Sequence, residues 1–331
     1  MLFVTGGLGY IGSHFVVSAL QAGHDVLVLD NLSNSHADVQ AKIEMICQRS
    51  FICVHGDVRD AALLNRLFGE HDIKAVVHFA GLKSVAESVA NPLIYYDNNV
   101  HGSQILLQAM LKHGVYRLIF SSSATVYGEP HYLPYDEQHP TNPVNPYGHS
   151  KRHVEQMLAD VCVAHPNFTA ISLRYFNPIG AHSSGLIGEN PKDIPNNLMP
   201  YVLKVAKGEL PYLQIFGDDY DTKDGTGERD YIDIMDLVAG HMAAMAYLAN
   251  TGHHVFNLGT GKSTTVLELV SAFELANDLS INKKVVARRD GDLPKFWASV
   301  DKANILLNWT AKNSINTSCV MAFGVLADLK R

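Results

Sequence analysis

The chain has 331 residues, of which 47% are hydrophobic and 18% charged, and its formal net charge is -7. This length and composition are enough for a large buried core, in one large domain or in two joined ones. The net negative charge argues against nucleic acid or an anionic membrane surface as the main partner.

The N-terminal segment carries the first motif. Residues 2–5 are apolar and predict a short strand that leads into the glycine loop 6–12, Gly-Gly-Leu-Gly-Tyr-Ile-Gly. A helix over 11–21 and a buried strand over 25–30 are expected to follow. A glycine loop between a strand and a helix lets backbone N–H groups approach a pyrophosphate, and the helix N-terminus favours its charge. Asp30 ends the second strand, where a carboxylate would accept from ribose hydroxyls and repel a 2′-phosphate. The segment therefore predicts a dinucleotide cofactor, NAD rather than NADP.

Strands and helices continue to alternate as far as residue 177. We predict strands over 51–54, 75–78, 117–120 and 169–175, and helices over 99–112 and 147–165. This alternation predicts an α/β fold with a doubly wound, Rossmann-like parallel sheet. Ligands of such sheets bind beyond the carboxyl ends of the strands. Residues at these ends include Gly6, Asp30, Asp57, Phe79, Lys83, Ser123 and Asn177.

A serine cluster at 121–123 and the pair Tyr147 and Lys151 are the candidate catalytic groups. Tyr147 and Lys151 are four residues apart in a predicted helix, so they share one face. A tyrosine ionises near ~10, and a neighbouring ammonium group lowers that pKa, which would let Tyr147 move a proton to and from an alcohol. Taken alone, the same spacing also fits an ordinary surface pair, and it is the glycine loop that favours catalysis.

The residue composition changes after Asn177. Residues 178–200 are rich in Gly, Pro, Asn and Ser, which predicts a long functional loop. Shorter elements follow, with helices expected over 198–207 and 235–249, strands over 213–216 and 254–258, and a strand-to-helix turn at 259–264. We predict an NAD-binding Rossmann-like domain over 1–177 and a smaller α/β substrate domain over 178–331. Some elements of the second domain can pack against the first. Arg229 and Arg289 fit either a solvated surface or a substrate diphosphate.

These motifs together resemble the extended short-chain dehydrogenase/reductase family, and in particular its members that act on UDP-hexoses. The likeness extends to about Trp309, and the role of the divergent tail 310–331 is left open. The resemblance is carried by residues 5–14, 29–32, 78–83, 95–99, 121–128, 147–151, 174–178, 194–201, 225–231 and 288–294.

The resemblance implies an isomerase that interconverts UDP-galactose and UDP-glucose by reversible NAD-dependent oxidation at C4, through a 4-keto sugar. Tyr147 would be the base, Ser123 would hydrogen-bond the same oxygen, and Lys151 would hold the nicotinamide ribose and lower the Tyr147 pKa. By matching position, the cofactor would be bound by Gly6, Gly9, Tyr10, Ile11, Gly12, Asp30, Asn31, Asp57, Val58, Phe79, Ala80, Lys83, Asn98, Tyr147, Lys151 and Tyr175. The substrate would be bound by Ser123, Asn177, Asn197, Leu198, Phe216, Arg229, Arg289, Asp292 and Phe296.

Two further expectations follow from the resemblance. Phe296 is bulkier or less polar than the usual residue at its position, so we expect it to disfavour N-acetylated hexoses. Members of the family are usually homodimers through two helices, which here correspond to 99–113 and 147–165.

Three other functions are considered. A 4,6-dehydratase of the same fold carries an acidic pair just after the serine, where this chain has Ala124 and Thr125. A net dehydrogenase or reductase would have to exchange its cofactor freely, and the sequence does not decide this. A non-catalytic NAD-binding regulator would be expected to lack the pair Tyr147 and Lys151.

The sequence also bears on location and metals. The N-terminus has no basic segment before its apolar run, so we expect no signal peptide, no membrane span and a cytoplasmic protein. The 4 cysteines include no Cys-x-x-Cys pair, which indicates reduced thiols. The 17 histidines show no metal-ligand spacing, so we expect no metal.

Overall fold

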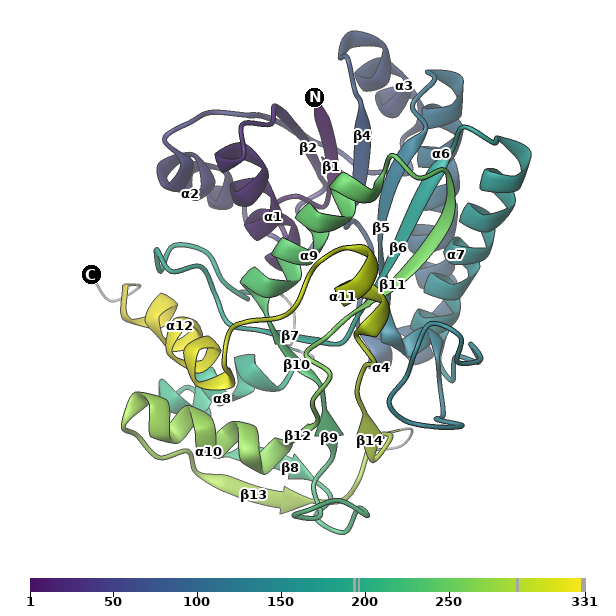
Figure 1. The fold of residues 1–331 in the computed structure, drawn as a ribbon. Helices are drawn as coiled ribbons and strands as arrows, with labels where there is room; N and C mark the ends of the chain where they lie inside the picture. The colour runs from purple at the N-terminus through teal and green to yellow at the C-terminus, as the bar shows by residue number, and fades with distance from the viewer. Residues whose placement is uncertain (193–194, 196, 290–291, 329–331) are drawn as a thin grey trace.

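A seven-stranded parallel sheet is the centre of the molecule (Figure 1). The computed structural model describes residues 1–192, 195, 197–289 and 292–328. The strands follow the order β11-β6-β5-β4-β1-β2-β3, and every neighbouring pair is parallel. Their bounds are β1 (Leu2–Thr5), β2 (Val26–Asp30), β3 (Ile52–His55), β4 (Ala75–His78), β5 (Arg117–Ser123), β6 (Thr169–Tyr175) and β11 (Gly252–Leu258). The predicted doubly wound sheet is confirmed.

Helices cover both faces of this sheet, because alternate strand residues point to opposite sides. Val4 and the side chains of neighbouring strands that point to the same face pack in one apolar core with α1 (Tyr10–Gln21), α2 (Asp38–Cys47) and α9 (Ile234–Tyr247). Phe3 and its equivalents pack in a second core with α3 (Ala61–Glu70), α6 (Gly102–Lys112) and α7 (Pro146–Ala164). The inner strands are thus buried on both faces, as their continuous apolar runs predict, whereas the edge strand β3 is partly exposed.

The chain leaves β1 for β2 on one side and continues in β4 on the other side. This reversal of strand order opens a crevice at the carboxyl ends of β1 and β4, where α1 also begins. Short helical elements lie beside this crevice. Three of them come from the connection between β4 and β5, and one comes from the segment directly after β5. They are α4 (Val85–Ala90), α5 (Pro92–Tyr95), a π-helix over Tyr96–His101 and a 3₁₀ turn over Ala124–Val126.

The π-helix is one difference from the prediction, which placed a regular helix from residue 99. Asn99 lies in this wider turn, where its amide bonds the backbone of Leu82 and the hydroxyl of Ser150 on α7. Ser150 in turn donates to the Tyr147 carbonyl at 2.7 Å. The irregular turn therefore connects the loop after β4 to the first turn of α7.

A smaller region lies at the lower end of the molecule in Figure 1 and has an apolar core of its own. It contains α8 (Leu198–Ala206), α10 (Val266–Asn277), α12 (Ile315–Asp328), β8 (Leu213–Phe216) and β13 (Lys283–Val286). Thr265 and Glu268 form a capping box that starts α10 directly after the 259–264 turn. The short strands and helix between the two regions are β7 (Asn177–Ile179), β9 (Glu228–Arg229), β10 (Tyr231–Asp233), β12 (Thr264–Thr265), β14 (Lys295–Phe296) and α11 (Asp301–Leu306).

The chain crosses between the two regions more than once. After Asn177, both α9 and β11 return to the large sheet, where β11 pairs with β6 along its whole length. The tail helix α12 packs on α10, and its Ser318 hydroxyl donates to Asp233 at 2.6 Å. The division at residue 177 stays a prediction.

Candidate active site

A cavity of about 1670 Å³ opens along the carboxyl ends of the parallel strands and extends into the smaller region. The large sheet contributes the glycine loop and the end of β2 to its walls. The strands β9 and β14, between the two regions, contribute Arg229 and Phe296. One continuous space therefore joins the two sets of residues that the sequence assigns to cofactor and to substrate.

The glycine loop forms a cradle at one wall of the cavity. Gly6 has φ 68°, and a Cβ there would lie 2.7 Å from the Ala80 nitrogen. A Cβ on Gly12 would lie 2.1 Å from the Gly6 carbonyl oxygen. Gly9 is the N-cap of α1, and no side chain among the described residues caps this helix. The first N–H groups of α1 thus face the cavity and suit an anionic group.

Asp30 lies beside the glycine loop at the end of β2, lines the cavity and is buried. Its carboxylate accepts from the Leu8 and Leu32 backbone N–H groups at 3.0 and 2.9 Å. It also accepts from the Ser35 hydroxyl at 2.7 Å. These bonds fix a negative charge where a ribose diol would bind, so the predicted preference for NAD over NADP has a structural basis.

Tyr147, Ser123 and Lys151 converge at the inner end of the cavity. Ser123 is the last residue of β5, and Tyr147 and Lys151 lie one turn apart on α7. The hydroxyl of Ser123 hydrogen-bonds that of Tyr147. Lys151 Nζ donates to the Ser121 carbonyl at 2.7 Å and lies 5.9 Å from the Tyr147 ring centroid. The proposed base and its two polar neighbours are therefore brought together.

The pKa of Tyr147 depends on burial and on the neighbouring side chains. Burial raises the pKa of Tyr147, and the hydrogen bond from Ser123 opposes that rise. Burial lowers the pKa of Lys151 to about 8, against the attraction of Glu155. The Lys151 ammonium group is directed to the Ser121 carbonyl, and its effect on the Tyr147 pKa stays a prediction. Further positive charge at this end of the cavity is needed to form the phenolate.

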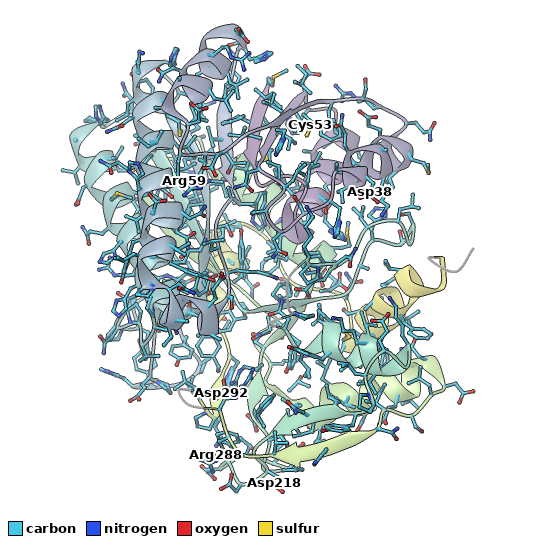
Figure 2. The ribbon with its side chains drawn as sticks, turned by 180° about the vertical axis from the view of Figure 1, so that it is seen from behind. Asp38, Cys53, Arg59, Asp218, Arg288 and Asp292 are labelled. Atoms are coloured by element: carbon cyan, nitrogen blue, oxygen red, sulfur yellow. The ribbon has the colours of Figure 1, made fainter. Side chains whose placement is uncertain are left out.

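Two arginines flank Asp292 at the other end of the cavity. Arg289 Nε donates to the Asp292 carboxylate at 2.9 Å, and Arg229 lies 3.7 Å from its other oxygen. Arg288 instead pairs with Asp219 at 2.6 Å, and Figure 2 shows Arg288 and Asp292 in the smaller region. Arg289 also covers the Phe216 ring at 4.5 Å. Arg289 thus lines the cavity, whereas Arg288 is not among the described lining residues, and both side chains remain exposed.

Phe296 belongs to an aromatic wall near the catalytic corner. Its ring packs against Tyr135 and Phe176, with centroids 5.0 and 5.2 Å away, and it lines the cavity. A well-packed ring cannot move aside easily for a larger substituent. This supports the expectation that Phe296 restricts the size of the sugar.

Three of the predicted site residues, Asp57, Leu198 and Phe216, are not among the described residues that line the cavity. Asp57 is held by Arg59, which lowers its pKa, and it accepts from Asn31 at 3.0 Å. The predicted residues that do line the cavity are Gly6, Gly9, Tyr10, Ile11, Gly12, Asp30, Asn31, Val58, Phe79, Ala80, Lys83, Asn98, Ser123, Tyr147, Lys151, Tyr175, Asn177, Asn197, Arg229, Arg289, Asp292 and Phe296. Residues 194, 196, 290 and 291 of the motifs lie outside the described residues.

Comparison with known proteins agrees with this geometry. Residues 2–259 match the NAD dependent epimerase/dehydratase family. The chain belongs to this family. A UDP-glucose 4-epimerase of Neisseria meningitidis serogroup C is 51% identical over 316 residues, which cover 95% of this chain and 93% of the relative. A UDP-glucose 4-epimerase of Pasteurella multocida is 50% identical, with 95% and 94% covered.

Solved structures of this family superpose closely on the chain. UDP-glucose 4-epimerase from Bifidobacterium longum, in complex with NAD+ and UDP, matches with a TM-score of 0.96 and 48% identity, covering 99% of this chain and 98% of that one. The Stenotrophomonas maltophila enzyme, with bound NAD and formylated UDP-arabinopyranose, matches with 0.97 and 45%, covering 100% and 98%. The predicted family, the Rossmann-like fold, the isomerase class and the NAD cofactor are confirmed.

The chain's own residues fit the cofactor of the epimerase/dehydratase family. The uncapped start of α1 suits a pyrophosphate, and the close backbone packing at Gly6 and Gly12, which leaves no room for a Cβ, keeps the loop before this helix tight. The hydrogen-bonded carboxylate of Asp30 suits a ribose diol. These residues would hold NAD.

Sequence reasoning missed a strap over the cavity, defined here as residues 185–192. Glu189 accepts from Lys83 at 2.9 Å and from Asn197 at 2.6 Å. Lys192 donates from Nζ to the Leu32 carbonyl at 2.8 Å. The strap therefore ties the loop after β2 to α8. The long Gly- and Pro-rich loop was its only sequence signal, and that signal names no residue.

Two observations bear on other ligands and surroundings. Within the described part of the chain, no helix has the length and apolarity needed to cross a membrane. In the same residues, no group of three or more His, Cys, Asp or Glu side chains is placed to hold a metal ion. The cysteines among them are free.

Proposed function

We propose that this epimerase interconverts UDP-galactose and UDP-glucose, with Tyr147 as the base that acts at the sugar C4. The observation that carries this is the single cavity with Tyr147 and Ser123 at its inner end and two arginines at the other. A UDP-hexose laid between them places its diphosphate near Arg229 and Arg289. The curated relatives named UDP-glucose 4-epimerase, at 50–51% identity, support the same substrates.

The roles of the residues follow from their geometry. Tyr147 takes the proton of the 4-hydroxyl, and the Ser123 hydroxyl holds that oxygen in place. NAD supplies the acceptor for the hydride from C4. The resulting 4-keto sugar must turn within the cavity so that C4 receives the hydride on its other face, while Tyr147 returns the proton. Lys151, held by the Ser121 carbonyl, contributes positive charge beside the phenol.

The test is to incubate the purified protein with UDP-galactose without added NAD. UDP-glucose should accumulate with no net NADH, because hydride returns to the same carbon. A 4-keto-6-deoxy product would show a dehydratase instead. A protein that keeps NAD bound but converts no UDP-sugar would favour the regulator.

Replacing Phe296 with Ala should admit N-acetylated substrates. The smaller side chain removes one ring of the aromatic wall, so we expect kcat/KM for UDP-N-acetylglucosamine to rise about 10-fold or more relative to UDP-glucose. Phe296→Tyr, which keeps the ring, is the matched control and should show no gain. Wild-type turnover of both sugars at similar rates would contradict the assigned role of Phe296.

Replacing Lys192 with Ala should loosen the strap over the cofactor. It removes one hydrogen bond to Leu32, worth about 0.5–1.5 kcal/mol, so NAD should leave about 2- to 10-fold faster. The measurement is the rate at which bound NAD exchanges with labelled NAD. Lys74→Ala, which removes an exposed surface pair with Asp72, is the control. Equal exchange rates in the two variants would show that the strap does not retain the cofactor.

Two finer assignments belong to the same proposal. We infer a homodimer through residues 99–113 and 147–165, and exposed Val163 on α7 supports an apolar contact there. We also infer a cytoplasmic protein, which the free cysteines support.

A further inference from the structure

Tyr175 and His241 form a hydrogen-bonded pair in the wall of the cavity. Tyr175 is the last residue of β6 and lines the cavity, whereas His241 lies on α9 and is fully buried. The Tyr175 hydroxyl is bonded to His241 Nε2. The resemblance implies that Tyr175 contacts the cofactor, but the mechanism above gives no role to its hydroxyl or to His241.

The surroundings of His241 decide which partner donates. His241 Nδ1 lies 2.8 Å from the Leu237 carbonyl, which can only accept, so Nδ1 carries the proton. Burial lowers the pKa of His241 to about 4, so the ring is neutral at physiological pH and Nε2 has no proton. Tyr175 must therefore donate its only proton to His241.

The consequence is a hydroxyl with a fixed direction. Phe15 and Phe79 pack against the His241 ring, with centroids 5.9 and 5.1 Å away, and keep the imidazole in place. Burial keeps the pKa of Tyr175 high, so the phenol stays protonated. With its proton committed to His241, the Tyr175 oxygen can only accept hydrogen bonds from any other group.

Tyr175 lies at the catalytic end of the cavity. Tyr175 and Ser123 are directly paired across β5 and β6. Tyr175 also lies close enough to Ser121 and Tyr147 for both residues to affect its pKa. If Tyr147 acts at C4, the nicotinamide ring must lie at this end, and its one N–H donor is the carboxamide.

We propose that His241 is a positioning residue that orients the Tyr175 hydroxyl as an acceptor and so makes this end of the cavity selective for the carboxamide N–H of the cofactor. The inference rests on the proposed function, because that function places the nicotinamide beside Tyr147. The chemistry follows from pairing: a carboxamide N–H meets a lone pair, whereas a carboxylate in its place meets a lone pair with a negative charge.

The test compares NAD with nicotinic acid adenine dinucleotide, which has that carboxylate. Holoenzyme is exchanged to equilibrium with an equal mixture of the two, and the bound nucleotides are measured by mass spectrometry. Wild-type protein should prefer NAD by about 10-fold or more. In His241→Leu the Tyr175 proton is free to turn to the carboxylate, so the preference should fall to within about 3-fold. His241→Gln, which keeps an acceptor, should retain most of it.

His253→Leu is the matched control, because His253 Nε2 bonds the Ser172 hydroxyl at 2.9 Å and lies outside the cavity lining. Its preference should equal that of wild type. Tyr175→Phe should lower the preference without any change at His241, which keeps the test usable if His241→Leu does not fold. If wild-type protein epimerises UDP-galactose and the preference for NAD is unchanged in both His241→Leu and Tyr175→Phe, this inference is wrong and the proposed function still stands. A wild-type protein that binds neither nucleotide overturns the proposed function and this inference with it.

Discussion

Replacing Tyr147 with Phe is expected to slow the conversion of UDP-galactose by about 10²- to 10⁴-fold while NAD stays bound. The change removes only the hydroxyl that accepts the 4-hydroxyl proton. The ring keeps its edge contact with Tyr95, at a centroid distance of 6.5 Å, so α7 keeps its place. The measurements are kcat with UDP-galactose and the NAD content of the purified variant.

The burial of Tyr147 indicates which kinetic constant should change. Because burial raises the pKa of Tyr147, the free phenol is a weak base, and the positive charges of Lys151 and of bound NAD must act together to release its proton. A variant without the hydroxyl has no nearby substitute, since the Ser123 hydroxyl is a far weaker base. We therefore expect the loss to appear in kcat rather than in KM.

Tyr127→Phe is the matched control for this experiment. The Tyr127 hydroxyl is also buried and donates to Asn257 at 2.6 Å, but Tyr127 is not among the described residues that line the cavity. Its loss should reduce stability and leave turnover near normal. Near-normal turnover in Tyr147→Phe itself would show that another group is the base.

Much of the fold follows from local patterns. The apolar strands, the glycine loop and the acid at Asp30 lie within one stretch of chain, where short-range periodicity and turn chemistry decide the structure. The order of the central strands then places the predicted residues at one edge of the sheet. For this reason Gly9, Ser123 and Tyr147 reach the same cavity although they are far apart in sequence.

Other features depend on contacts that no local pattern contains. The return of β11 to the large sheet requires pairing with β6, some 80 residues earlier in the register Gly252 to Thr169. Glu189 gains its place from Lys83 and Asn197, and a single acid in a polar loop has no periodicity. The direction of Lys151 likewise depends on the Ser121 carbonyl, which side-chain spacing does not reveal.

Replacing Glu155 with Ala is expected to lower the free energy of unfolding by about 3–5 kcal/mol. Glu155 and Arg174 form an ion pair whose side chains are only 3% and 6% exposed. Arg174 binds both carboxylate oxygens, at 3.0 and 2.6 Å, and Ser122 donates to one of them at 2.6 Å. Without Glu155, a buried guanidinium loses its counter-charge, and its third nitrogen already has no partner among the described residues.

The ion pair lies next to the catalytic residues Ser123 and Lys151, so Glu155→Ala should have a second effect. Ser122 precedes Ser123 on β5, and Glu155 follows Lys151 by one turn of α7 and supports its positive charge. Glu155→Ala should therefore also lower kcat in the protein that remains folded. Asp38→Ala is the control for an ion pair of ordinary strength, because Lys42 and Asp38 are partly exposed, and it should cost only about 0.3–0.5 kcal/mol.

A double variant separates the buried charge from the packing. If the cost of Glu155→Ala comes from an unpaired guanidinium, replacing both Glu155 and Arg174 with Leu should cost less than Glu155→Ala alone, because no buried charge remains. Chemical denaturation of the single and double variants measures the difference. If the double variant loses as much stability as the summed losses from replacing Glu155 and Arg174 with Leu one at a time, the ion pair contributes through its shape and its hydrogen bonds to Ser122 rather than through charge. That result would contradict the electrostatic account of this pair, and with it the support of Lys151 by Glu155.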